Sequence, residues 1–216
     1  MKEKLVENIK NAYLTPLAIF VNILATITYV MPIFSENLAK KLPLYLYLFL
    51  GFWIIINIIH YLQERSKTVR IDKFSVFRYF IINILCGYSI PLALSSTYIV
   101  GATINGFEVF NYWLLLVGAN ILSWLGLHIF LCSEFEISKA MSGMIYNLLG
   151  IIILIISIGL IIYLSIAVPS TGDDSKYIWM SIIPLLCAEL LIGRSYLNLS
   201  LYLDPENDSE KEEVAE

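Results

Sequence analysis

Charged residues are scarce in this chain. They make up 15% of its 216 residues, whereas a soluble globular domain carries about 25%. Apolar residues are in excess: they account for 58% of the chain, with a mean hydropathy of +0.76, against roughly 45–50% in soluble domains. This composition excludes an ordinary water-soluble fold and indicates a protein whose main partner is the lipid bilayer.

Catalytic and metal-binding motifs are missing as well. The sequence contains no P-loop, no G-x-G-x-x-G, no H-E-x-x-H and no G-x-S-x-G, which are the motifs of phosphate, dinucleotide, zinc and hydrolase sites. Cys86, Cys132 and Cys187 show no C-x-x-C spacing, so neither a disulfide framework nor a metal site is predicted. We therefore expect no cofactor and no enzyme activity.

Long apolar runs dominate what is present. Six segments approach the ~20 residues with which a helix crosses ~30 Å of hydrocarbon; they cover residues 12–34, 43–62, 76–100, 110–132, 144–168 and 177–199. The predicted fold class is an all-α polytopic helical membrane bundle of about six transmembrane helices over residues 1–203. Four or five spans are the alternatives, because Pro184, Glu189 and Arg194 interrupt the sixth segment.

Lysine and arginine are distributed unevenly between the predicted loops. Residues 63–78 hold five of them and the N-terminus holds three, whereas residues 101–111 hold none. Because these residues accumulate in cytoplasmic loops, we expect a multi-pass protein of the cell inner membrane with both termini in the cytoplasm. The basic residues of the short loop 63–78 are explained by this orientation. They therefore give no reason to expect direct nucleic-acid binding.

The last 13 residues, 204–216, are strongly acidic. They contain seven of the 18 acidic residues and Lys211 as their single basic residue. This composition predicts a disordered cytoplasmic tail that does not fold alone. A solvated terminus is one interpretation. The other is a docking segment for a soluble partner, carried by Asp204, Glu206, Asp208, Glu210, Glu212 and Glu213.

Ionisable residues within the apolar segments are the first functional candidates, since such residues are costly in lipid. Glu189 and Arg194 lie in the sixth segment, about 7.5 Å apart along a helix axis and ~140° around it, which is unfavourable for pairing within one helix. Either Arg194 reaches the inner interface while Glu189 is bonded within the bundle, or Glu189 belongs to a proton, ion or ligand path with His60 or His128.

Two further patterns concern packing. Each of the first five segments contains an asparagine within its apolar run, namely Asn22, Asn57, Asn83, Asn120 and Asn147. An amide in lipid must bond to a neighbouring helix or line a polar lumen. Ser89, Ala93, Thr97 and Gly101 recur at every fourth residue and predict a small-residue ridge for close helix packing. The ridge serves either the bundle interior or contacts between protomers.

These observations favour a non-enzymatic membrane subunit, forming a homo-oligomer, that senses or anchors at the membrane and engages a soluble cytoplasmic protein. The alternative is a small channel or transporter that uses Glu189 with His60 or His128. In its overall outline, several spans with a small charged tail, the chain resembles the small multi-pass membrane subunits of bacterial anti-phage defence systems such as Kiwa. The resemblance implies a role in defence; it covers architecture only and transfers no residues.

Overall fold

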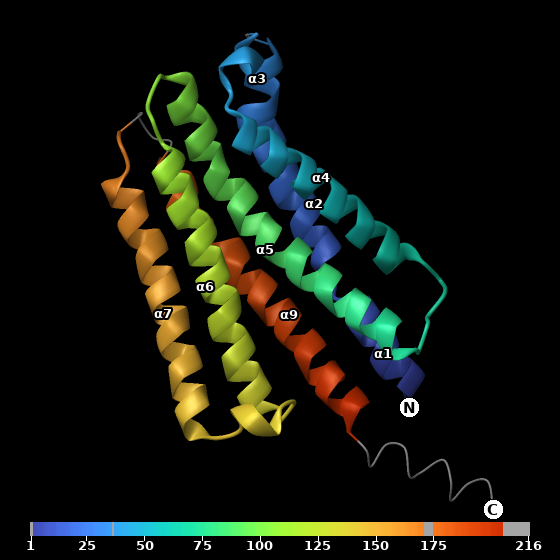
Figure 1. Ribbon diagram of the computed structural model, residues 1–216. Helices are drawn as coiled ribbons and strands as arrows, with labels where there is room; N and C mark the ends of the chain where they lie inside the picture. Colours follow the sequence, from blue (N-terminus) through green and yellow to red (C-terminus); the bar gives the residue numbers. More distant parts are fainter. Residues whose placement is uncertain (1, 36, 171–174, 205–216) are drawn as a thin grey trace, which may run out of the picture.

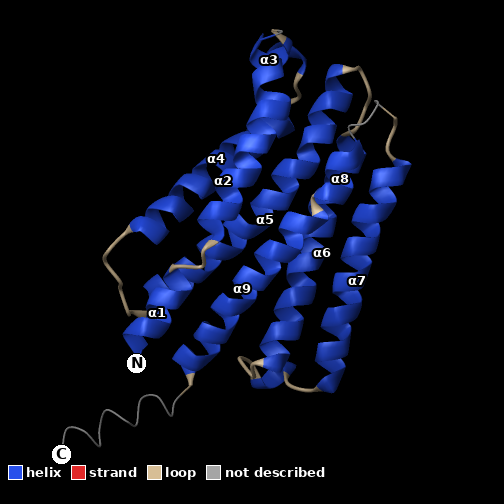
Figure 2. Ribbon diagram, turned by 180° about the vertical axis from the view of Figure 1, so that it is seen from behind, coloured by secondary structure: helices blue, strands red, loops and turns tan. Residues whose placement is uncertain are grey.

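The computed structural model describes residues 2–35, 37–170 and 175–204. In chain order the elements are α1 (Lys2–Lys10), α2 (Leu14–Ala25), the π-helical turn η1 (Thr26–Val30), α3 (Met31–Ser35), the 3₁₀ turn η2 (Leu38–Lys41), α4 (Leu44–Arg65), α5 (Lys73–Ile104), α6 (Phe110–Glu134), the 3₁₀ turn η3 (Lys139–Met141), α7 (Met144–Ala167), α8 (Lys176–Met180) and α9 (Ile182–Leu203). Figure 2 shows helices and connecting loops throughout this part of the chain.

Six helical segments are long and apolar enough to cross a membrane, and the described residues contain no strand. The segments are Lys2–Ser35, Leu44–Arg65, Lys73–Ile104, Phe110–Glu134, Met144–Ala167 and Lys176–Leu203. The predicted all-helical class with six candidate spans is therefore confirmed. Pro184, Glu189 and Arg194 do not interrupt the last segment, because α9 continues through all three, and its irregularity falls at Ser181 instead.

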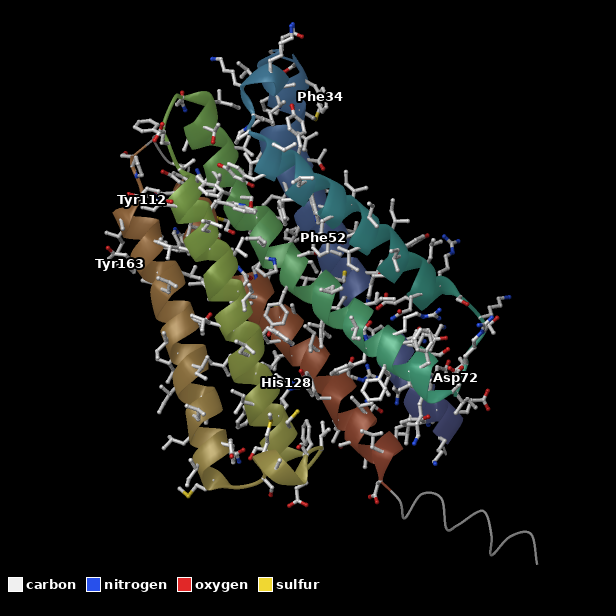
Figure 3. All side chains as sticks on the ribbon, viewed as in Figure 1. Phe34, Phe52, Asp72, Tyr112, His128 and Tyr163 are labelled. Atoms are coloured by element: carbon white, nitrogen blue, oxygen red, sulfur yellow. The ribbon has the colours of Figure 1, made fainter. Side chains whose placement is uncertain are left out.

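The segments form one elongated bundle with two distinct ends (Figure 1). The first end, named here the termini end, carries α1, the loop 66–72, the loop 135–143 and the last turn of α9. The far end carries α3 and the loop 105–109. Large apolar side chains cover much of the outside; Tyr163, for example, is 62% exposed on the side of α7 turned away from α6 (Figure 3). An apolar exterior of this kind is expected of a lipid-facing surface.

Helix α5 runs through the centre of the bundle (Figure 1), and most of its side chains are buried between Tyr88 and Val100. A helix that is apolar on all sides belongs inside a bundle. Its start is fixed by Asp72, whose carboxylate accepts a hydrogen bond of 2.9 Å from the Ser75 amide, the usual N-cap arrangement. This backbone hydrogen bond lowers the pKa of Asp72.

Helices α6 and α7 pack against each other at backbone distance. An added Cβ on Gly150 would lie 2.7 Å from the Phe130 amide nitrogen and 2.8 Å from the Gly126 carbonyl oxygen. Ser157 of α7 also donates to the Ala119 carbonyl of α6 at 2.8 Å. Small residues thus allow the close approach that is typical of helix pairs in lipid.

The first candidate span differs from its prediction. It begins at Lys2 rather than residue 12, and it is broken between α1 and α2, where Tyr13 has a left-handed backbone with φ 62°. The N-terminal residues were expected to precede the membrane, but Val6, Ile9 and Lys10 are buried. The physical reason is that α1 packs along α9, so its apolar side chains are covered by protein.

Candidate functional site

Glu189 lies in α9 between α5 and α6, and its side chain is buried, with 8% exposure. Its carboxylate accepts a short hydrogen bond from the hydroxyl of Ser123 in α6. The hydroxyl of Tyr88 in α5 donates to the same oxygen at 3.5 Å. Among the described residues no lysine, arginine or histidine pairs with this carboxyl. Tyr88, Ser123 and Glu189 are named here the carboxyl cluster.

Arg194 is exposed and does not pair with Glu189, as the helix geometry predicted. Its guanidinium donates to the Asn8 side-chain oxygen at 3.3 Å and lies over the Tyr13 ring, 4.9 Å from the centroid. Both contacts lie on the first segment, at the termini end. The side chain therefore extends from α9 toward α1 and the break that follows it.

His128 lies between α6 and α9 (Figure 3). Its Nδ1 atom and the Tyr196 hydroxyl are 2.7 Å apart and share a hydrogen bond. Tyr196 is 1% exposed and meets Phe80 of α5 edge to face. The His128–Tyr196 pair is nearer the termini end than the carboxyl cluster, by about 10 Å along α9, at 1.5 Å per residue.

His60 is remote from this row and lies at the break between α1 and α2. Its Nδ1 is 3.4 Å from the Thr15 hydroxyl, and its Nε2 is 3.5 Å from the Glu64 carboxylate. The same carboxylate accepts from the Leu14 amide at 3.1 Å and so satisfies the first turn of α2. The structure does not bring His60 to Glu189, and only His128 shares the α6–α9 interface with it.

Asn83 and Gln63 form hydrogen bonds with the α1 side of the break. Asn83 donates to the Ile9 carbonyl at 2.6 Å and to the Ser195 hydroxyl at 3.3 Å. Gln63 donates to the Lys10 carbonyl at 3.2 Å and to Asn83 at 2.9 Å. Carbonyls at the end of α1 thus receive side-chain donors in place of the helix bonds that the break removes.

The five asparagines do not form one ring. Asn22 donates to Asn57 at 3.2 Å and accepts from Trp53 at 2.9 Å, which joins α2 to α4. Asn120 bonds only the Leu116 carbonyl of its own helix, and Asn147 donates to Glu134 at the α6–α7 loop. Asn22, Asn57, Asn83 and Asn147 therefore link helices, whereas the printed bond of Asn120 stays within its own helix.

The predicted ridge on α5 faces the bundle interior. Ser89, Ala93 and Thr97 are buried, and Gly101 is partly buried. Thr97 and Gly101 also line a cavity of about 430 Å³ at the far end, beside the π-helical turn. Contacts between protomers are not needed to explain the ridge.

Sequence reasoning missed the hydroxyl partners of Glu189. Serines and tyrosines occur in most of the apolar segments. No pattern along the chain distinguishes Ser123 and Tyr88 from the others. The buried Lys10, 2% exposed, was also missed; its ammonium donates to the Ser66 carbonyl. Of the acidic tail, only Asp204 is described, so the other five proposed partner-binding residues lie outside the described residues.

Comparisons with known proteins concern the family of the chain. Neither the curated proteins nor the solved structures include a match to it. A family model, described as a domain of unknown function (DUF5079), matches residues 3–212. Except for Lys2, the match covers the six candidate spans. It therefore includes the carboxyl cluster and the break between α1 and α2. The chain is therefore a member of the DUF5079 family.

Proposed function

We propose that this protein is a small channel or transporter that conducts protons across the membrane, in which Glu189 takes up and releases the proton. The observation that carries the proposal is the burial of Glu189 among apolar helices with two hydroxyl donors and no basic partner in the described residues. A carboxyl in hydrocarbon strongly favours its neutral form unless a counter-charge stabilises the anion. Such a group gains and loses a proton as its hydration changes.

The α6–α9 interface supplies a row of groups able to pass a proton toward the termini end. Ser123 and Glu189 occupy its middle, and His128 and Tyr196 follow in the same direction. Hydroxyls and imidazole both donate and accept hydrogen bonds, and histidine is a frequent proton carrier. Of the two histidines offered from the sequence, the geometry therefore supports His128 and assigns His60 to the break in the first segment.

The experiment is a proton-flux measurement in vesicles. Purified protein is reconstituted with a trapped pH-sensitive dye, and an inward proton movement is driven by a potassium gradient with valinomycin. Glu189→Gln is expected to reduce the flux to that of protein-free vesicles, because the amide keeps the hydrogen-bonding shape without a titrating proton. Glu108→Gln, an exposed carboxylate in the far-end loop, is the matched control and should retain it. Equal flux from Glu189→Gln and the unaltered protein would refute the proposal.

We further propose that the protein is a multi-pass inner-membrane protein with the termini end in the cytoplasm, as the lysine and arginine distribution favours. The test uses exposed positions in opposite loops, Thr68→Cys and Glu108→Cys, in a background with Cys187→Ser. In intact cells an impermeant maleimide should label the Glu108→Cys variant alone, and permeabilised cells should label both. Labelling of the Thr68→Cys variant in intact cells would reverse the orientation.

Engagement of a soluble partner, assembly into a homo-oligomer and a role in defence stay predictions from the sequence. The first depends mainly on the acidic residues after Asp204, which lie outside the described part of the chain. The description of the matched family mentions neither a partner nor defence. Proton conduction is preferred because its evidence, the contacts of Glu189 with Tyr88 and Ser123, lies within the described residues.

A further inference from the structure

A groove of about 600 Å³ lies between α6 and α9 on the outside of the bundle. Its walls are mainly apolar and include Phe130 of α6, Phe135 directly after α6, and Leu186, Leu190 and Leu197 of α9. The three leucines are 43%, 78% and 42% exposed, respectively. Along α9 the groove extends from Leu186 to Leu197, which is about 16 Å at 1.5 Å per residue. One leaflet contributes about half of the ~30 Å of bilayer hydrocarbon, so the groove has the length of one acyl layer.

Arg194 also lines this groove, and it is the single basic residue to do so among the described residues. Its guanidinium extends toward the termini end, since it contacts Asn8 and Tyr13. If Tyr177 marks the far headgroup level, Arg194 is about 25 Å further along the segment, within side-chain reach of the opposite headgroups. The apolar walls therefore lie at acyl-chain depth, and the charge lies close to headgroup depth.

The Arg194 guanidinium has N–H groups available for a further hydrogen-bond partner. It uses one hydrogen bond on Asn8, and an arginine side chain carries five N–H groups in a planar fork that matches a phosphate. Glu134, the last residue of α6, accepts a hydrogen bond of 2.9 Å from Asn147 of α7. Elsewhere at the termini end both signs of charge are exposed, for example Lys4 and Glu7 of α1, so Arg194 is the group in the groove that selects a phosphate.

We propose that this groove binds one anionic phospholipid, with an acyl chain along α6 and α9 and its phosphate at Arg194. Basic side chains between helices on the cytoplasmic side are favourable positions for anionic headgroups. Glu189 also lines the groove, so the bound acyl chain passes beside the carboxyl cluster. Lipid binding at Arg194 does not require proton transfer at Glu189, and the two are measured separately.

Native mass spectrometry of the full-length protein in detergent, titrated with phosphatidylglycerol or phosphatidylcholine, tests the proposal. We expect one phosphatidylglycerol to bind in preference to phosphatidylcholine. Arg194→Gln should weaken that preference about fivefold, the effect of removing one basic side chain near a membrane surface. Arg78→Gln is the matched control, because Arg78 is also exposed at the termini end but does not line the groove; it should leave the preference unchanged.

A second variant tests the apolar wall. Leu190→Gln places an amide in the groove without altering charge, and it should weaken binding of both lipids. Equal binding of the two lipids by the unaltered protein, or an undiminished preference in Arg194→Gln, would overturn the proposal. Glycerol phosphate, which lacks acyl chains, should not displace the lipid; displacement by it would show a site for a soluble anion instead. A melting temperature like that of the unaltered protein in each variant excludes loss of the fold as the cause.

Discussion

Gly150→Ala is expected to destabilise the protein by about 1–3 kcal/mol, the usual cost of overpacking a tight interface. The added Cβ would lie 2.7 Å from the Phe130 amide nitrogen and 2.8 Å from the Gly126 carbonyl oxygen. These are backbone atoms, which cannot turn aside as a flexible side chain can. Helix α7 must therefore move away from α6, with loss of the close packing along the pair.

Gly159→Ala is the control for this prediction. It lies on the same helix, and an added Cβ there meets nothing within 4 Å. Alanine is better than glycine in a helix by about 0.8–1.0 kcal/mol, so this variant should be as stable as the original protein or more stable. The measurement is reversible unfolding of both purified variants in mixed detergent micelles. If the two variants unfold alike, the α6–α7 contact is not as tight as the structure shows.

The number and type of the helices could be predicted because each candidate span is a long apolar run, and hydrocarbon thickness sets its length. The break in the first segment has one local signal: Pro16, in the first turn of α2, has no backbone N–H to donate to the Ala12 carbonyl four residues earlier. The partners of the freed backbone groups could not be predicted, because Glu64, Gln63 and Asn83, which bond them, are distant in sequence.

The candidate site could likewise be predicted only in part. Burial of Glu189 follows from its position in an apolar run, and its separation from Arg194 follows from helix geometry. Its partners depend on which faces of α5 and α6 meet α9, and that is a property of packing in three dimensions. His60 and His128 were equal candidates as partners of Glu189, because each lies near the end of a predicted segment. Depth alone does not say which neighbouring helix a side chain faces.

Asn83→Leu is expected to cost about 1–3 kcal/mol of stability. Asn83 is fully buried and bonds Ile9 of α1, Gln63 of α4 and Ser195 of α9. Leucine of similar size leaves the Ile9 carbonyl without this donor, and a buried polar group left unsatisfied costs about 1–3 kcal/mol. The Gln63 amide keeps the Lys10 and Tyr79 carbonyls as acceptors. The average interhelical hydrogen bond in lipid contributes only ~0.6 kcal/mol. A larger loss is expected here because the broken helix offers the Ile9 carbonyl no other donor.

Asn120→Leu is the control for Asn83→Leu. It measures how far replacing a buried asparagine by leucine changes stability when no bond between helices is lost. Asn120 is also buried in a central part of a span, but its amide bonds only the Leu116 carbonyl of its own helix. That carbonyl keeps its backbone helix bond when the side chain is removed, so the variant should be unchanged or slightly more stable. Unfolding of the two leucine variants in the same detergent compares them directly. A difference near 0.6 kcal/mol or less would mean that the break in the first segment persists without Asn83. A difference of about 1–3 kcal/mol would mean that Asn83 stabilises the break by its bond to the Ile9 carbonyl.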